Sequence, residues 1–429
     1  MAEKGYPRVL AVSCNPFSAG GSNGKVFSEL FCDWDEDKLA QFYVSNEMPN
    51  FSGCRRYYRL TDNEAKNAFL GKKTYGRPLT GEEKETNRSA SAKAGKPIAK
   101  NPLTRYLRNL IWNSGRWQSP AFYRWVDEFS PEVIVLMAGD STFIPKIAMK
   151  LAKRSNIPLV IFNTENYYFK DYNYLKAQGH PFFSWLFRKS FKKTFRKLMK
   201  VSVFEIYNSE YLAEVYRRGF HKECTAIYQP TSLTPFPKKP QFEGKFSYMG
   251  NLGVGRHTPL IEIGAALREI SPDYYLDVYG RAPSPTVEKL LREAAGVRFH
   301  GLIPYSEVKE KMEKSDLLFH AETADEFYIK DLAAAFSTKI SDSLLSGRPL
   351  VLYAHESLAC TQYLLKNGCA HVITDKETLM ARLRDICESE SLRDAYVEKA
   401  LAVGQENHNA KKNCQRMKEI LSSVAKREK

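Results

Sequence analysis

The chain has 429 residues, of which 43% are hydrophobic, so it is long enough for two domains with apolar cores of their own. Its 64 lysines and arginines outnumber its 49 aspartates and glutamates, and the net charge of +15 predicts an acidic partner such as nucleotide phosphates, anionic lipid or nucleic acid. The eight cysteines form no CxxC or CxxH pair, which argues against a structural zinc site and against a disulfide framework.

The sequence shows no recognisable targeting or membrane-spanning segment. The N-terminus is a polar lead-in to a strand rather than a signal peptide, and no apolar run is long enough to span a bilayer. We therefore expect a cytoplasmic protein in a reducing compartment.

Short apolar runs alternate with amphipathic stretches along the first half of the chain. Such runs are typical of buried strands, and the stretches between them have helical periodicity. The predicted strands are 9–13, 39–44, 133–138, 159–162, 203–207 and 225–228, and the predicted helices include 24–31, 143–154 and 209–217.

The second half repeats this alternation. Its predicted strands are 246–249, 275–279, 297–299, 317–319, 350–353 and 371–374, and its predicted helices are 258–270, 286–295, 305–313, 338–346 and 357–366. Strands joined by crossover helices predict an α/β protein of two Rossmann-like, doubly wound domains, with ligand loops at the carboxyl ends of the strands.

A proline-rich junction separates the two halves. Residues 229–240 hold four prolines without apolar periodicity, which predicts a linker between an N-terminal domain (1–232) and a C-terminal domain (233–404). We expect the two domains to face each other across a cleft, where small-molecule sites are usually built. The C-terminal helix, about 405–426, is predicted to pack back onto the first domain, and the polar segment 71–101 is predicted to be a basic, flexible insertion.

The first predicted strand is followed by a glycine-containing loop. Gly24 and Lys25 resemble the end of a P-loop, but Val26 stands where a magnesium-binding Ser or Thr is required, so a P-loop is excluded. Gly20 and Gly21 would still allow close backbone approach to a ligand on the acceptor side. A tight turn without a ligand is the alternative.

Residues 181–200 carry seven basic side chains and no acidic one. On a helix, Phe187, Phe191 and Phe195 share one face, and basic residues cover much of the rest. A basic amphipathic helix with aromatic residues is typical of a segment that lies in an anionic membrane interface. We predict membrane contact by these residues: Phe187, Phe191, Lys192, Lys193, Phe195, Arg196 and Lys197. The alternative is a crossover helix that buries its phenylalanines on the sheet.

Strand ends in the second half carry glycine and cationic residues. Gly250 and Asn251 follow the first strand, with Arg256 close behind, and the next two strands end in Gly280-Arg281 and Gly301-Leu302. A planar guanidinium suits the oxygens of a diphosphate. The spacing is not that of a dinucleotide fingerprint, so a nicotinamide cofactor is not expected.

The segment 337–351 has the signals of a short helix followed by a strand. Ser337 or Thr338 can cap the helix, Gly347 supplies a left-handed stop, and Pro349 blocks continuation. A hydroxyl-rich helix N-terminus can hold a phosphate, and Asp342 lies one turn further along, where it can accept a hydrogen bond from a sugar. An ordinary capped helix is the alternative.

These landmarks, in this order, resemble the donor domain of glycosyltransferase family 4, whose members (the group 1 glycosyl transferases) have the GT-B fold. The resemblance covers most of the chain and is specific in the second half, where the segment Ser337-Thr338-Lys339-Ile340 resembles one variant subgroup. The landmarks in the second half are Gly250-Asn251-Leu252, Leu276 to Gly280, Phe299-His300-Gly301 and Gly347 to Val351; those in the first half are Gly20-Gly21, Asn208-Ser209-Glu210 and Gln229-Pro230.

The resemblance implies roles for individual residues. Asp342 would bind the donor ribose, Arg256 the pyrophosphate, and the amides near Thr338 and Lys339 a phosphate. The first glutamate of the family's E-x7-E motif would fall at Ala334, so Glu322 or Glu326 is expected to substitute for it. The family's histidine in the first domain is replaced by Asn163-Thr164-Glu165-Asn166, which makes Glu165 the catalytic candidate on the acceptor side.

The resemblance therefore implies a hexosyltransferase that uses a nucleotide-diphosphate sugar, needs no metal and no further cofactor, and retains configuration. The basic helix suggests a glycan or lipid-linked acceptor at the inner face of the membrane, as in cell-surface polysaccharide synthesis. Alternatives are a GT-B sugar-nucleotide epimerase and a non-catalytic nucleotide-sugar-binding or scaffold subunit, which the alanine at 334 keeps open. No nucleic-acid-binding module is recognised.

Overall fold

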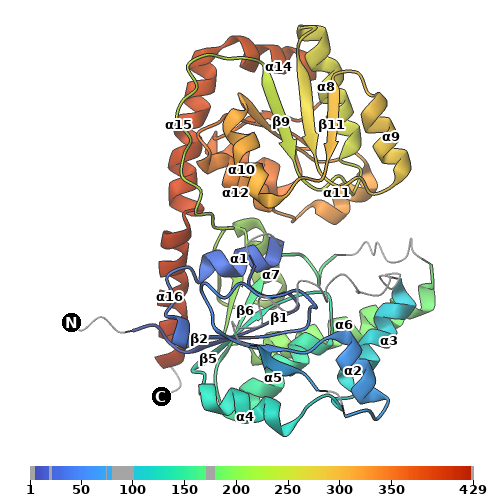
Figure 1. Cartoon of the computed structure of the whole chain (residues 1–429), viewed down its shortest axis with the longest axis vertical. Helices are drawn as coiled ribbons and strands as arrows, with labels where there is room; N and C mark the ends of the chain where they lie inside the picture. Colours follow the sequence, from blue (N-terminus) through green and yellow to red (C-terminus); the bar gives the residue numbers. More distant parts are fainter. Residues whose placement is uncertain (1–4, 19–21, 74, 80–100, 171–178, 427–429) are drawn as a thin grey trace. The chain divides into compact units, whose positions relative to one another are not determined.

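The computed structural model describes residues 5–18, 22–73, 75–79, 101–170 and 179–426. The chain forms two compact units, Met1–Tyr228 with Asn413–Lys429, and Gln229–Lys412. The first unit therefore ends four residues before the expected boundary, and the chain returns to it within the last helix. Each unit is a sheet covered by helices (Figure 1).

Unit 1 contains an eight-stranded sheet in the order β4-β3-β2-β1-β5-β6-β7-β8, in which all neighbours are parallel except β3 and β4. Its strands are β1 Val9–Ser13, β2 Leu39–Tyr43, β3 Arg56–Arg59, β4 Arg77–Leu79, β5 Val133–Met137, β6 Leu159–Asn163, β7 Phe204–Tyr207 and β8 Cys224–Ala226. Its helices are α1 Ser22–Leu30, the 3-10 helix Glu36–Lys38, α2 Asp62–Phe69, α3 Pro102–Asn113, α4 Pro120–Phe129, α5 Phe143–Ser155, α6 Pro181–Val201 and α7 Glu210–Phe220. β4 lies within the segment 71–101 that is predicted to be a flexible basic insertion, so part of this segment joins the sheet; residues 74 and 80–100 lie outside the described residues.

Unit 2 contains a six-stranded parallel sheet in the order β11-β10-β9-β12-β13-β14. Its strands are β9 Lys245–Met249, β10 Tyr275–Tyr279, β11 Val297–Gly301, β12 Leu317–Ala321, β13 Leu350–Tyr353 and β14 His371–Ile373. Its helices are α8 His257–Ile270, α9 Pro285–Glu293, α10 Tyr305–Lys314, α11 Glu326–Leu332, α12 Thr338–Leu345, α13 Ala359–Asn367, α14 Leu379–Glu388 and α15 Glu390–Asn407. Every strand predicted here is present, because buried parallel strands read as short, nearly continuous apolar runs.

The last helix, α16 (Ala410–Lys426), belongs mostly to unit 1. Cys414, Met417, Leu421 and Val424 recur along one face of α16 and lie in the same core cluster as residues of β1, β5 and β6. This spacing of three to four residues is that of an amphipathic helix, which explains why the end of the chain packs on the first unit.

Residues of the proline-rich segment are fixed within unit 2. The amide of Thr231 donates to the carbonyl of His408 (2.7 Å), and the ring Nδ1 of His408 lies 2.8 Å from the carbonyl oxygen of Gln229. Burial lowers the pKa of His408 to about 4, although the Gln229 carbonyl and Asp342 act in the opposite direction. The neutral ring therefore joins this segment to the turn between α15 and α16.

No helix among the described residues is both long and apolar enough to cross a membrane.

Candidate functional site

The strand order of unit 2 places two loops at its topological switch point. From β9 the chain proceeds outward through β10 and β11, and from β12 it proceeds outward in the other direction through β13 and β14. In open α/β sheets the crevice beyond the carboxyl ends of the two central strands is the usual ligand site. The loops in question are 250–256 after β9 and 322–325 after β12.

The loop after β9 has an unusual backbone where it leads into α8. Val254 has a φ of 53°, and Gly255 a φ of 75°. The left-handed region is a genuine outlier for a β-branched residue, and such strain collects at ligand-binding sites. A side chain at Gly255 would lie 2.7 Å from Oγ1 of Thr323, so this glycine lets the β9 loop approach the β12 loop closely.

A buried ion pair joins the same two loops. Nε of Arg256 donates to Oε2 of Glu322 (2.7 Å) and Nη2 donates to Oε1 (2.9 Å), while Nε2 of His320 lies 3.2 Å from Oε1. The Glu322 side chain is only 5% exposed. Burial raises its pKa, but the His320 hydrogen bond and the charge of Arg256 outweigh burial and hold the pKa below its ordinary value. Two predicted site residues are thus bound to each other, and Glu322 stays ionised.

His257, the first residue of α8, is a further candidate site residue that the sequence pattern did not single out. Its Nδ1 is buried and has no hydrogen-bond partner among the described residues. Burial lowers the pKa of the ring, which favours its neutral form. The sequence signal was its place directly after Arg256, at the start of a helix whose free amides favour an anion.

Glycines bring the loops after β9, β10 and β11 together. The amide of Gly250 donates to the carbonyl of Tyr279 (2.9 Å), and the amide of Gly280 donates to the carbonyl of Gly301 (2.8 Å). A side chain at Gly280 would lie 2.0 Å from the carbonyl oxygen of Gly250. Gly301 has a φ of 75° and open space around its α-carbon. The predicted glycines therefore lie in neighbouring loops along one edge of the sheet, which we call the rim.

The rim carries one aromatic stack. The rings of Tyr279 and His300 are stacked 4.6 Å apart, and Nε2 of His300 lies 2.6 Å from Oδ1 of Asp277. The other predicted residues of these loops, Asn251, Arg281 and Leu302, are exposed. Oδ1 of Asn251 accepts a hydrogen bond from the amide of Gly253 (2.9 Å), so it shapes the loop.

The helix predicted at 338–346 is α12. Oγ of Ser337 accepts a hydrogen bond from the amide of Lys339, and Gly347 has the predicted left-handed φ, here 72°. Asp342 is half-buried and Oδ1 accepts a hydrogen bond from Oγ1 of Thr231 (2.5 Å). Asp342 therefore fixes the start of unit 2 to α12, and its role as a ribose ligand stays a prediction.

The remaining catalytic candidates lie on other elements. Glu326 is exposed at the first position of α11, which is capped by Asp325. Glu165 follows β6 in unit 1, and its Oε2 lies 4.0 Å from Nζ of Lys170. Gly20 and Gly21 lie outside the described residues.

Membrane contact by Phe187, Phe191 and Phe195 is contradicted by the structure. All three are at most 5% exposed and belong to the face of α6 that packs inside unit 1; Phe195, for example, contacts the rings of Tyr168 and Tyr216. The alternative, a crossover helix with buried phenylalanines, is correct for this face. Lys193, Arg196 and Lys197 are exposed, and Lys192 is half-buried.

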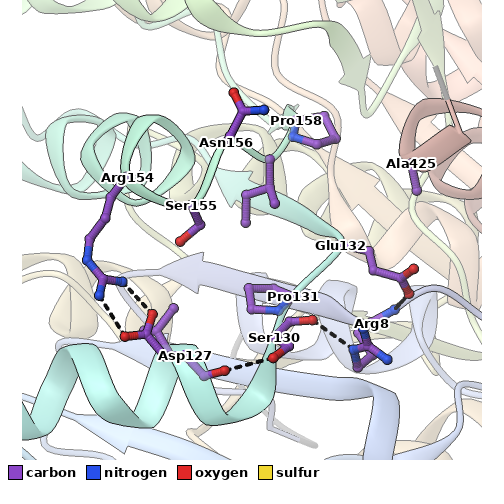
Figure 2. A pocket seen from close by; sticks show the side chains of 12 residues that line it. Arg8, Asp127, Ser130, Pro131, Glu132, Arg154, Ser155, Asn156, Pro158 and Ala425 are labelled. Atoms are coloured by element: carbon purple, nitrogen blue, oxygen red, sulfur yellow. Dashed lines mark hydrogen bonds and ion pairs between the residues drawn. The ribbon is translucent and has the colours of Figure 1, made fainter. Parts of the chain in front are cut away.

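A cavity of about 540 Å³ lies in unit 1 at the amino ends of β1, β5 and β6 (Figure 2). Its arginines are bound by neighbouring groups: Arg154 and Asp127 form a two-pronged ion pair, and Nε of Arg8 donates to the backbone carbonyl of Ser130 (2.7 Å). Ligands of doubly wound sheets bind at the opposite, carboxyl ends of the strands. We therefore assign no part of the candidate site to this cavity.

Solved structures of similar architecture include three with nearly complete coverage. HepE from Anabaena, in complex with UDP and glucose, matches with a TM-score of 0.62 at 12% identity over 97% of this chain and 100% of its own. Sucrose-phosphate synthase from Thermosynechococcus elongatus gives 0.63 at 13% identity, over 97% of this chain and 99% of its own. WaaG, a glycosyltransferase involved in lipopolysaccharide biosynthesis, gives 0.54 at 13% identity, over 96% and 99%.

Similarity at this level of identity shows the fold alone. The chain has the GT-B fold, which confirms the predicted α/β architecture of two doubly wound units. No protein-family model matches the sequence, and no curated protein does either. Membership of glycosyltransferase family 4, and of its variant subgroup, remains a prediction.

Proposed function

We propose that the chain is a glycosyltransferase that moves a hexose from a nucleotide-diphosphate sugar to a glycan or lipid-linked acceptor in cell-surface polysaccharide or glycolipid synthesis. The observation that carries the proposal is the start of α8 at the switch point of unit 2. Three features adjoin there: a loop with positive φ angles at Val254 and Gly255, the Nδ1 of His257 that has no partner among the described residues, and the Arg256–Glu322 ion pair. The similarity to HepE, which was solved with UDP, UDP-glucose, and UDP and glucose, supports a nucleotide-sugar donor.

The chemistry of sugar transfer explains the choice of groups. When the bond from sugar to diphosphate breaks, negative charge builds up on the leaving phosphate and positive charge on the sugar. The amides at the start of α8 and the guanidinium of Arg256 can stabilise the leaving group without a metal, and each well-placed donor contributes about 3–4 kcal/mol to transition-state stabilisation. Asp342 would bind the ribose, and Glu165 would act on the acceptor side with retention of configuration.

One observation favours a second candidate function, a non-catalytic nucleotide-sugar-binding subunit. Ala334, where the family motif has a carboxylate, is buried, and the substitute Glu322 is bound to both Arg256 and His320. In that case the site would bind a donor without turning it over.

A donor screen tests both functions. A nucleotide sugar that binds only the folded chain must raise its thermal unfolding midpoint. We expect one or more donors of a UDP- and GDP-sugar panel to do so and to be hydrolysed slowly. Arg256→Ala should weaken binding by tenfold or more, which corresponds to about 1.4 kcal/mol.

The control is Arg292→Ala, which removes an exposed arginine that is paired with Glu288 on α9. Stabilisation by no donor would refute a nucleotide-sugar site. Binding without turnover, with every acceptor and with water, would favour the non-catalytic subunit.

A membrane-facing surface on unit 1 is the second part of the proposal. Phe182 and Trp185 at the start of α6 are 63% and 57% exposed, and Nζ of Lys189 lies 4.9 Å above the Trp185 ring. α3 packs beside α6 (Figure 1), and its Leu107 and Leu110 are also exposed. Exposed aromatic residues next to lysines favour the interface of an anionic bilayer. We therefore assign the membrane contact to this surface instead of to the buried phenylalanines.

Liposome flotation tests the surface. We expect the chain to float with vesicles rich in anionic lipid, and the pair Phe182→Ser/Trp185→Ser to remain largely in the soluble fraction. Charge reversal of Lys193, Arg196 and Lys197 should have a similar effect that high salt reproduces in the wild type. Leu290→Ser, at an exposed leucine of unit 2, is the matched control. Equal flotation of all variants would rule out this surface.

A further inference from the structure

Two cysteines that are far apart in the sequence meet in unit 1. Cys32 lies just after α1, and Cys414 lies near the start of α16. The two sulfur atoms and a carboxylate oxygen of Asp33 all lie within 4.8 Å of one another. Cys32 is exposed, whereas Cys414 is only 1% exposed and belongs to the core cluster of the unit.

The two thiols have different surroundings. The nearby Cys32 thiol lowers the pKa of Cys414 against the effect of burial. The backbone amide of Asp33 and the ammonium of Lys418 act in the same direction, and the Asp33 carboxylate acts against them. The nearby Cys414, together with burial and the acids Asp33 and Glu29, raises the pKa of Cys32. The exposed Cys32 is the thiol that a dissolved oxidant can reach, and the buried Cys414 lies beside it.

We propose that Cys32 and Cys414 form a reversible disulfide by exchange with a low-molecular-weight disulfide such as glutathione disulfide. Cys32 gives up its proton to solvent and its thiolate attacks the oxidant, so that a bond from Cys32 to glutathione forms, the glutathione disulfide bond breaks, and one glutathione thiolate leaves. Cys414 then loses its proton and attacks the sulfur of Cys32, which forms the protein disulfide and releases the second glutathione thiolate. Two electrons pass from the protein thiols to the oxidant, and the two glutathione thiolates take up the two protons.

The Cys32–Cys414 disulfide would form where the chain returns to unit 1. Asn413, the first residue of the returning segment, directly precedes Cys414. A bond to Cys32 ties the first turn of α16 in this unit to the segment after α1, and so opposes local unfolding of the helix. In a reducing compartment such a bond is transient and responds to oxidant, which makes the pair a redox-sensitive modification site.

A metal is the competing occupant of the same cluster. Two thiolates and one carboxylate supply three ligands, whereas a closed structural zinc site has four. The cluster contains no fourth His, Cys, Asp or Glu among the described residues, so the disulfide is the better fit.

The test uses the full chain. The reduced protein is incubated with glutathione disulfide, alkylated and mapped by mass spectrometry. We expect a linked peptide pair containing Cys32 and Cys414, a higher thermal midpoint than that of the reduced chain, and full reversal by dithiothreitol. Cys32→Ser, at an exposed position, should fold normally and lose both the link and the shift. Cys224→Ser, at a half-buried cysteine that instead donates to the carbonyl of Ala213, should retain them.

Three outcomes would overturn the proposal. In the first, Cys32 remains as a mixed disulfide with glutathione and Cys414 stays reduced. In the second, both thiols resist the oxidant. In the third, the reduced wild type, but not Cys32→Ser, retains one Zn²⁺ per chain through gel filtration and is thereby protected from oxidation, which would identify a metal site instead.

Discussion

Glu322→Ala is expected to lower the free energy of unfolding by about 3–5 kcal/mol, because it leaves the guanidinium of Arg256 buried without its carboxylate. The Arg256 side chain is 13% exposed, so water cannot replace the lost partner at full strength. Chemical denaturation monitored by circular dichroism measures this loss. The same variant should weaken nucleotide-sugar binding in the donor screen, because Arg256 would no longer be held beside the start of α8.

Two further variants separate the charge from the shape of the side chain. Glu322→Gln keeps the volume but removes the charge, and it should lose most of the same stability. In the double variant Arg256→Ala/Glu322→Ala the unpaired charge is gone, so the cost should be smaller than the sum of the two single costs. Lys376→Ala is the control, because Lys376 is exposed and pairs with the half-buried Glu262, and its loss should cost about 1 kcal/mol or less. A Glu322→Ala loss no larger than this control would refute the argument.

The pair also gives stability a defined dependence on pH. The folded state holds the pKa of Glu322 below its unfolded value, so the contribution is complete above the unfolded pKa of about 4.3 and is lost as the pH falls through the folded pKa. Below about pH 4 the wild type should therefore lose more stability than Glu322→Gln does. Unfolding curves measured from pH 7 down to pH 3 would reveal the difference.

Gly280→Ala is expected to abolish donor binding while it costs the fold about 1–3 kcal/mol through overpacking. The new methyl group would lie 2.0 Å from the carbonyl oxygen of Gly250 and 3.3 Å from Cγ of Leu252, so the loop after β9 has to move. That loop leads directly to Arg256 and α8. Calorimetric titration with the donor that the screen identifies measures the loss.

Gly301→Ala is the matched control on the neighbouring strand. Its α-carbon has open space around it, but its φ of 75° disfavours a side chain, so it should cost about 1–2 kcal/mol from backbone strain alone. Because it leaves the loop after β9 in place, its donor affinity should change much less than that of Gly280→Ala. Equal losses in the two variants would mean that the contact between Gly280 and Gly250 does not matter for binding.

The local pattern of the sequence located most of unit 2 correctly. Each predicted strand exists there, and the helix predicted at 338–346 spans Thr338–Leu345, with Ser337 as its N-cap and the left-handed Gly347 shortly after its end, because caps and apolar periods act over a few residues. In unit 1 the strand β3 and the helices α2, α3 and α4 were not predicted, and β4 lies in the segment taken as an insertion. Short strands at the margin of a sheet carry a weak apolar signal, since fewer of their side chains are buried.

The sequence by itself determined the two α/β halves, the positions of the strand-end loops and the basic surface of α6. Only the tertiary structure decided what these residues contact: Arg256 binds Glu322, Asp342 accepts from Thr231, and Cys32 meets Cys414. The tertiary structure also decided that the phenylalanines along one face of α6 are buried. Periodicity is a local property that shows which face of a helix is apolar, whereas the order of strands in a sheet, which brings distant residues together, depends on contacts across the whole unit.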